Sequence, residues 1–128
     1  MTDFKTLLSV KKFVSTKFAK AKESDTITLG AKKMDKENVT CLLVHKGSKL
    51  NGIITESDIV RKVIAAGHDP KKTELKSVMT QSIIYVEADE SLFDAKKKME
   101  EHGVRHLVVK EGDNIIGTVS VRELAGNL

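Results

Sequence analysis

The apolar positions of this chain repeat with a shift of 65 residues. Residues 24–59 align without a gap to residues 89–124, and the apolar positions, the glycines and the small hydroxyl residues keep their class. The pairs that carry the alignment are Met34 with Met99, Val39 with Val104, Leu42 with Leu107, Val44 with Val109, Gly47 with Gly112, Gly52 with Gly117, Thr55 with Ser120 and Asp58 with Glu123. Self-similarity at a fixed period indicates a duplicated structural unit. The sequence therefore predicts one unit built twice.

Both copies predict the same order of elements. Apolar and small residues at helical spacing predict helices near residues 27–34 and 92–99. Asn38 and Gly103 suit the left-handed position that ends a helix. The candidate residues for beginning these helices are Ser24 or Thr26 and Asp89 or Ser91. Two strands with a Gly-containing turn between them then predict a hairpin in each copy. These strands are expected at 40–45 and 50–55, and at 105–110 and 115–120.

Further elements complete each copy. A leading strand is predicted at residues 83–86 and, with a weaker pattern, at 18–22. Apolar spacing after Thr55 predicts a closing helix over residues 59–64 that ends at Gly67. The fold class is therefore α/β (α+β), with two pseudo-symmetric β-α-β-β-α repeats. Because one such repeat leaves a sheet face uncovered, the two are expected to pack sheet to sheet.

The length of 128 residues fits a single module spanning residues 1–128. The only proline lies in the segment 67–73, which marks the boundary between the repeats. Repeat 1 is assigned to residues 7–68 together with an N-terminal helix, and repeat 2 to residues 69–128. The helical character of the N-terminal segment comes from Phe4, Leu7, Leu8, Lys11, Phe13 and Val14. We expect this segment to pack on the module.

The charged residues are mixed in sign along the chain, with 22 basic and 18 acidic side chains and a net charge of +4. Such mixing is typical of a solvated surface and argues against a nucleic-acid partner, although nucleic-acid binding stays as a weaker alternative. A mildly basic balance favours an anionic ligand. The longest apolar runs have four or five residues, far from the roughly 20 of a membrane span, and no signal peptide is apparent. A cytoplasmic protein without a membrane partner is expected.

Catalytic and metal-binding patterns are not found in the sequence. Cys41 lies in an apolar, strand-like run, which favours a buried thiol over a reactive one. His102 and His106 have a spacing that would suit zinc on a helix, but Gly103 between them breaks that helix. No glycine-rich phosphate loop is present. We expect no metal, no cofactor and no enzyme activity.

The positions that keep their residue class between the two halves also resemble the motifs of a known family. Gly52-Ile-Ile-Thr55-Glu-Ser-Asp58 in the first half and Gly117-Thr-Val-Ser120-Val-Arg-Glu123 in the second resemble a pair of CBS motifs, often called a Bateman module. Val104-Arg105-His106-Leu107 is similar to the strand of such a motif, and the run from Ser77 to Thr80 to its opening. The resemblance covers residues 7–126.

The resemblance implies a regulatory, ligand-sensing module that stands alone. Its ligand would be an adenine-containing small molecule in a cleft between the repeats: AMP, ADP, ATP or S-adenosylmethionine. A homodimer and an unidentified protein target are implied as well. The resemblance also assigns a phosphate or ribose contact to the Thr or Ser of each Gly-x-x-Thr/Ser-x-x-Asp element, and a ribose contact to the Asp.

Two ligand sites are predicted. Site 1 comprises Val39, Thr40, Cys41, Thr55, Ser57 and Asp58. Site 2 comprises Thr80, Ile84, Val104, Arg105, His106, Ser120, Arg122 and Glu123. The residues themselves support these sites, because free amides where a strand meets a helix start favour phosphate. The carboxylate of Asp58 only accepts hydrogen bonds, which suits a vicinal diol.

Another interpretation of these elements remains open. Thr55-x-x-Asp58 and Ser120-x-x-Glu123 both fit a capping box, in which hydroxyl and carboxylate satisfy the first amides of a helix. Glu123 stands where the family pattern has Asp, and its extra methylene moves the carboxylate outward. Arg105, His106 and Arg122 would add phosphate donors at site 2. A structural or protein-interaction module that binds no nucleotide is therefore the alternative function.

Overall fold

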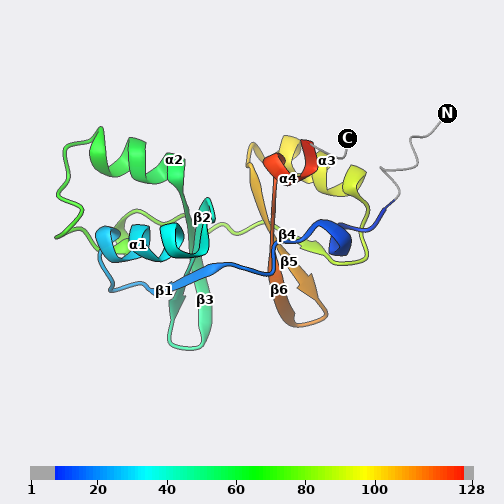
Figure 1. The fold of residues 1–128 in the computed structure, drawn as a ribbon, viewed down its shortest axis with the longest axis horizontal. Coiled ribbons are helices and arrows are strands. Elements are labelled where there is room, and N and C mark those ends of the chain that lie inside the picture. The colour runs from blue at the N-terminus through cyan, green and yellow to red at the C-terminus, as the bar shows by residue number, and fades with distance from the viewer. Residues whose placement is uncertain (1–7, 126–128) are drawn as a thin grey trace. The chain divides into compact units, whose positions relative to one another are not determined.

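The computed structural model describes residues 8–125, which form two compact units (Figure 1). The repeat-1 unit contains residues 17–83. The repeat-2 unit contains residues 84–125 together with the segment 8–16 from the beginning of the chain. Each unit holds a three-stranded sheet, so the predicted mixed α/β class is confirmed.

The repeat-1 unit begins with strand β1 (Ala19–Lys22) and helix α1 (Ile27–Glu37). The hairpin β2 (Cys41–Lys46) and β3 (Lys49–Thr55) follows, and then α2 (Glu56–Asp58), η3 (Ile59–Ile64) and the 3₁₀ turn η4 (Leu75–Ser77). The strand order is β1-β2-β3, with β1 parallel and β3 antiparallel to β2.

The repeat-2 unit has the same plan. The 3₁₀ turn η2 (Val10–Phe13) precedes β4 (Tyr85–Glu87), α3 (Leu92–His102), β5 (His106–Glu111), β6 (Asn114–Ser120) and α4 (Val121–Ala125). Its strand order is β4-β5-β6, again with one parallel and one antiparallel pair. The predicted β-α-β-β-α order is therefore confirmed in both copies.

The predicted helix ends are also confirmed. The Thr26 hydroxyl accepts a hydrogen bond from the Leu29 amide at 3.3 Å and caps α1, whereas Ser91 caps α3. Asn38 and Gly103 end these helices with φ of 53° and 63°. A left-handed residue there lets the next amides reach the last carbonyls of the helix.

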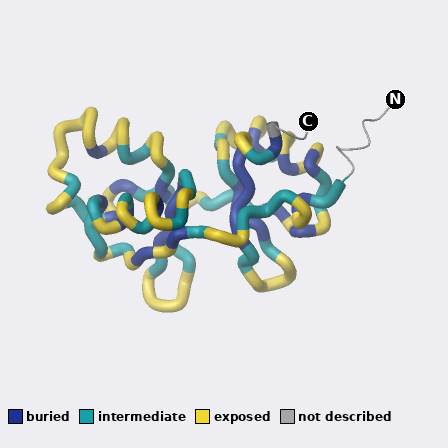
Figure 2. Tube along the Cα trace, in the orientation of Figure 1, coloured by how far each residue is buried: buried dark blue, intermediate teal, exposed yellow. Residues whose placement is uncertain are grey.

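Each unit has its own hydrophobic core (Figure 2). Leu42 and Leu107, which are equivalent under the 65-residue shift, are both fully buried. Met34 and Met99, a second aligned pair, are also core residues. The buried apolar surface of each helix faces its own sheet, and this burial is the main source of stability for the unit.

The closing helix of the repeat-1 unit departs from its expected form. Residues 59–64 form a π-helix, in which the Ala65 amide donates to the Val60 carbonyl at 2.8 Å. In the repeat-2 unit, α4 corresponds under the 65-residue shift to residues 56–60, and it is a short α-helix. A π-turn places an extra residue in the helix turn and changes which side chains face outward. Val60 and Ile64 are exposed on this element.

The two units exchange the segments that precede their leading strands. Residues 8–16 belong to the repeat-2 unit, where Ser15 and Thr118 exchange backbone hydrogen bonds of 2.8 and 3.2 Å. In the repeat-1 unit, Thr80 and Ile53 exchange two bonds of 3.0 Å in the same way. The boundaries of the compact units therefore differ from the boundary between residues 68 and 69 that the sequence indicated. Each unit contains main chain from both halves of the sequence.

The expected N-terminal helix lies partly outside the described residues, since Phe4 and Leu7 are not among them. Within the described part, residues 10–13 form only a 3₁₀ turn. The reason is that the backbone here pairs with the repeat-2 unit instead of with itself. The Val10 amide donates to the Glu90 carbonyl at 2.7 Å, and the Lys11 amide donates to the Ala88 carbonyl at 3.0 Å.

His45 is half-buried near the end of a strand. It lies in β2, and its Nε2 atom is buried without a hydrogen-bond partner. Burial lowers the pKa of His45, and the charge of Lys20 lowers it further. The neutral imidazole is therefore the form that the fold favours.

We expect stability to fall as the pH drops from about 7.5 to about 5.5. The unfolded chain takes up the proton near the ordinary histidine pKa of about 6.5, whereas the folded chain resists it to lower pH. Urea unfolding across this range should show a slope that His45→Gln reduces. His68→Gln, at an exposed histidine, is the matched control. An unchanged slope in His45→Gln would show that His45 is not the group responsible.

Candidate functional site

The hairpin of the repeat-1 unit brings the site-1 residues together. Cys41 at the start of β2 lies opposite Thr55 at the end of β3. The Glu56 amide, which begins α2, donates to the Thr40 carbonyl at 3.1 Å. Val39 precedes β2, and its amide donates to the last turn of α1. Residues 39–41 and 55–58 therefore lie at one junction between strands and helix.

Cys41 does not present its side chain at this junction, since it is 2% exposed. The interpretation of Cys41 as a buried thiol is confirmed. Ser57 is exposed in α2, and Val39 and Thr40 are half-buried.

Thr55 and Asp58 form a complete capping box. The Thr55 amide donates to Asp58 Oδ2 at 2.9 Å, and the Asp58 amide donates to Thr55 Oγ1 at 3.2 Å. The second carboxylate oxygen, Oδ1, lies 3.2 Å from Lys62 Nζ. The capping interpretation is therefore confirmed. These contacts do not use every acceptor position of the carboxylate, which has about four, and the Lys62 side chain is half-exposed.

Site 2 has the same architecture in the repeat-2 unit. His106 begins β5 opposite Ser120, which ends β6, and the Val121 amide donates to the Arg105 carbonyl at 3.0 Å. The longer Glu123 side chain still completes a cap. The Ser120 amide donates to Glu123 Oε2 at 2.6 Å, and the Glu123 amide donates to Ser120 Oγ at 3.4 Å.

The remaining site-2 residues of the repeat-2 unit lie close to this junction in the fold. Ile84 precedes β4, and its carbonyl accepts from the Val108 amide at 3.0 Å. At the end of α3, the Val104 amide donates to the Met99 carbonyl at 3.0 Å. Arg105 and Arg122 are exposed, as expected for donors to an anionic ligand.

Thr80 is the exception among the predicted site-2 residues. It lies in the repeat-1 unit, bonded to Ile53, two residues before Thr55. The sequence grouped it with residues 104–123 because it lies in the second half of the chain. Ser15 occupies the equivalent place on β6, beside Thr118, and was not predicted. The signal that finds it is the same 65-residue shift, extended back to residue 15.

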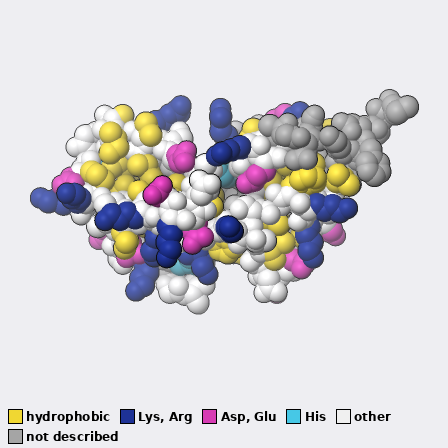
Figure 3. All heavy atoms as spheres, in the orientation of Figure 1, with side chains coloured by type: hydrophobic (Ala, Val, Ile, Leu, Met, Phe, Trp, Pro, Cys, Tyr) yellow, Lys and Arg dark blue, Asp and Glu magenta, His cyan; other side chains and the backbone are white. Residues whose placement is uncertain are grey.

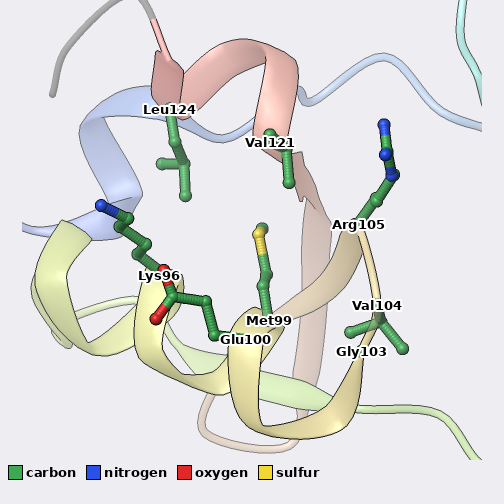
Figure 4. A pocket seen from close by; sticks show the side chains of 8 residues that line it. All are labelled: Lys96, Met99, Glu100, Gly103, Val104, Arg105, Val121 and Leu124. Carbon is green, nitrogen blue, oxygen red and sulfur yellow. The ribbon is translucent and has the colours of Figure 1, made fainter.

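A pocket of about 540 Å³ opens in the repeat-2 unit between the end of α3 and α4 (Figure 4). Apolar side chains line most of it, and Val121 and Leu124 from α4 point toward Met99 from α3. Charged side chains stand at its edge. The complete lining is Lys96, Met99, Glu100, Gly103, Val104, Arg105, Val121 and Leu124. Only Val104 and Arg105 were predicted as site residues.

Among residues 8–125, no cluster of three or more His, Cys, Asp or Glu side chains could hold a metal ion. Within the same residues, no helix has the length and apolar character required to cross a bilayer.

The family model of the CBS domain matches this chain twice, at residues 10–65 and 75–128. The chain belongs to the CBS domain family. The matched ranges correspond to the two repeats, so the predicted tandem pair is confirmed. CBS domains are generally regulatory, ligand-binding modules without catalytic activity of their own.

Relatives and solved structures agree with this assignment. The CBS domain-containing protein YhcV of Bacillus subtilis is 31% identical over 119 residues, which are 93% of this chain and 84% of YhcV. The chain spans only 20% of a longer relative, CBSCBSPB3 of Arabidopsis thaliana, at 32% identity over 88% of this chain.

Two solved structures show the same fold. A protein of Pyrococcus horikoshii has a TM-score of 0.86 at 25% identity, with 98% of this chain and 93% of that chain covered. The hexameric CBS-CP12 protein of bloom-forming cyanobacteria has a TM-score of 0.85 at 25% identity, with 92% of this chain and 69% of that chain covered.

Proposed function

We propose that this CBS pair is a sensor for an adenine-containing ligand: AMP, ADP, ATP or S-adenosylmethionine. The observation that carries the proposal is the junction at Thr55 and Asp58. It combines a hydroxyl at a helix start with a half-buried carboxylate, one oxygen of which lies 3.2 Å from the exposed Lys62 ammonium. A ribose diol can donate to this carboxylate in place of the Lys62 ammonium.

The repeat-1 unit is the better candidate for an anionic ligand. Residues 17–83 carry 13 basic and 8 acidic side chains, whereas the rest of the chain carries 9 and 10. The excess positive charge of the chain therefore belongs to the unit that contains Asp58. This distribution raises the local concentration of a nucleotide near site 1. Thr80, bonded to β3 beside this junction, joins the candidate site.

A thermal-shift titration with the four ligands tests the proposal. A ligand at about 100 times its Kd stabilises the folded state by about 2.7 kcal/mol. For a chain of this size, that corresponds to a rise of several degrees in Tm. A selective shift with one of them would support the sensor and identify its ligand class. The absence of a shift with all of them would overturn the proposal in favour of an interaction module.

Asp58→Ala is expected to weaken binding of the selected ligand at least tenfold, as measured by calorimetry. The reason is the loss of the acceptor for the ribose hydroxyls, each charge-assisted bond contributing about 1.5–3 kcal/mol. Glu123→Ala should have a smaller effect, because its carboxylate is displaced and the repeat-2 unit lacks the excess positive charge.

Asp94→Ala is the matched control for Asp58→Ala. Asp94 completes the capping box of α3 with Ser91, through bonds of 3.1 and 3.3 Å. Both substitutions remove the carboxylate of a cap, and each should cost about 0.5–2 kcal/mol of stability. Only Asp58→Ala should change binding. Equal effects of the two on affinity would show that Asp58 acts as a cap alone.

The chain is further proposed to act as a self-associating cytoplasmic protein, with ligand occupancy changing how it contacts a protein target. The support for self-association is the hexameric state named for the CBS-CP12 relative. Regulation of this kind requires the ligand to bind two states of the protein with different affinity.

A further inference from the structure

The side chain of Lys62 contacts the carboxylate of site 1. Lys62 lies four residues after Asp58, and its Nζ atom is 3.2 Å from Asp58 Oδ1. The Asp58 side chain is 18% exposed, whereas the Lys62 side chain is 49% exposed. The carboxylate is therefore largely enclosed at the junction of strands and helix, and the ammonium lies between this junction and solvent.

The element that carries Lys62 is itself unusual. Lys62 belongs to the π-helix η3, which begins at Ile59, directly after Asp58. π-helical segments are rare, and they occur frequently at functional sites. The pair formed by Asp58 and Lys62 thus spans the beginning of such a segment. This observation is independent of the ion pair and also indicates a functional role for the junction.

The two partners of Asp58 differ in how easily a ligand can replace them. Oδ2 accepts a hydrogen bond of 2.9 Å from the Thr55 amide, a main-chain group that the capping box holds in place. Lys62 contacts Oδ1 through a flexible four-carbon stem, and ion pairs as exposed as this one contribute little to stability. A ribose diol that donates to Asp58 would therefore displace the lysine and leave the amide where it is.

The displaced ammonium then requires a new partner nearby. A lysine ammonium has three donors and no acceptor, so an anion is the group that best replaces the lost carboxylate. In AMP, the phosphate is attached to C5′ of the same ribose that carries the diol. The flexible stem of Lys62 would let its ammonium move from the carboxylate to this phosphate.

We propose that Lys62 determines the specificity of site 1. In the free protein it is the counter-ion of Asp58, and in the complex it pairs with the 5′-phosphate of an adenosine phosphate. S-adenosylmethionine carries a positive sulfonium group at the same 5′ position, which the ammonium would repel. The proposal rests on the sensor function proposed above, and it narrows the ligand to AMP, ADP or ATP.

The second repeat has a different residue at this position. The 65-residue shift places Glu123 at the position of Asp58 and Asn127 at the position of Lys62. Asn127 lies outside the described residues, but an asparagine side chain has no charge. The exchange of a counter-ion between carboxylate and phosphate is therefore specific to site 1.

The general positive charge of the repeat-1 unit cannot supply the same selectivity. Figure 3 shows Lys and Arg side chains at several places on the visible face of this unit, with Asp and Glu side chains among them. A distributed charge attracts every anion and does not distinguish the parts of one ligand. Lys62 differs because it contacts the carboxylate that would bind the ribose. Its position relates the charge of the ligand to the ribose contact.

Calorimetry of the full chain with adenosine, AMP and S-adenosylmethionine tests the proposal. We expect wild type to bind AMP at least tenfold more tightly than the other two. Lys62→Met removes the ammonium and keeps an unbranched side chain, and it should weaken AMP binding at least tenfold. The same variant should strengthen adenosine binding by about 1.4- to 5-fold, because the diol no longer has to displace an ion pair.

Two further variants separate the role of Lys62 from its charge alone. Lys62→Arg keeps the positive charge and should keep the preference for AMP. Lys72→Met, at an exposed lysine of the same unit, makes the same change in net charge as Lys62→Met. It should leave all three affinities unchanged within about twofold. Equal losses for AMP and adenosine in Lys62→Met, or an equal loss for AMP in Lys72→Met, would overturn the proposal.

Failure of this proposal is distinguishable from failure of the sensor. If wild type binds adenosine or S-adenosylmethionine as tightly as AMP, the sensor stands and Lys62 does not determine its specificity. If wild type binds none of the three ligands, and neither ADP nor ATP, both proposals are wrong. Tight AMP binding that Lys62→Met leaves unchanged would overturn the role of Lys62 alone.

Discussion

Leu107→Ala should lower the free energy of unfolding by about 2–5 kcal/mol, the usual cost of truncating a fully buried leucine. Leu107 is 0% exposed in the core of the repeat-2 unit, among residues from both of its helices and its sheet. The substitution removes three carbons from water-free surroundings and leaves a cavity that the neighbouring strands fill only partly.

Leu42→Ala provides the comparison within the same molecule. Leu42 is the equivalent residue of the repeat-1 unit and is also 0% exposed. Because each unit contains main chain from both sequence halves, we expect the two units to unfold in one transition. Both variants should then shift the same transition, as measured by circular dichroism in urea.

Two outcomes would contradict this expectation. If each variant moved only one of two separate transitions, the units would be independent despite the exchanged segments. A change near zero for either variant would show that its leucine does not support the core. Leu29→Ala, at a leucine that is 41% exposed, is the control and should cost far less.

The order of elements could be predicted from the sequence because its causes are local. Periods of about 3.6 and 2 in the apolar positions separate helices from strands, and cap residues mark helix ends. Thr26, Ser91, Asn38 and Gly103 all occupy the predicted cap positions. The duplication strengthened each assignment, since a pattern that was weak in one copy was supported by the other.

The exchange of segments could not be predicted from the same signals. Ser15 and Thr118 bond through their backbones across more than a hundred residues of sequence, and a backbone bond leaves little trace in side-chain type. The alignment of the two repeats shows which positions are equivalent, but not which copy each segment contacts. For this reason the sequence grouped Thr80 with the second half of the chain, whereas the fold places it in the repeat-1 unit.

The π-helix at residues 59–64 had no recognisable signal either. Val60 and Ile64 have the spacing of an ordinary amphipathic helix, and the apolar pattern predicted no more than a closing helix here. Their exposure depends on the helix turn that the structure adopts. For each capping box, the sequence allowed two interpretations, a helix cap and a ligand site. The hydroxyl and the carboxylate can serve either purpose, so the sequence alone could not separate them.

Gly117→Ala should destabilise the protein more than Gly52→Ala, although the two glycines are equivalent under the repeat. Gly117 has φ of 155°, a backbone conformation that residues with a Cβ rarely adopt. Strain of this kind costs about 1–3 kcal/mol. In addition, a Cβ at Gly117 would overlap the carbonyl oxygen of Ser15, which is part of the backbone pairing with Thr118.

The surroundings of Gly52 differ in one decisive respect. A Cβ there would meet the side chain of Met79, with the sulfur at 2.5 Å. A methionine side chain has three rotatable bonds and can turn away. The Ser15 carbonyl cannot move without breaking the hydrogen bond that it accepts from the Thr118 amide.

Thermal and urea unfolding of the two variants would measure this difference. We expect a clearly larger loss of stability for Gly117→Ala, together with faster backbone amide exchange at Ser15 and Thr118, because the exchanged segment is forced off β6. Gly52→Ala should leave exchange at Ile53 and Thr80 nearly unchanged. Equal losses for the two variants would mean that segment 8–16 yields as easily as a side chain, and that its pairing with β6 contributes little to holding the repeat-2 unit together.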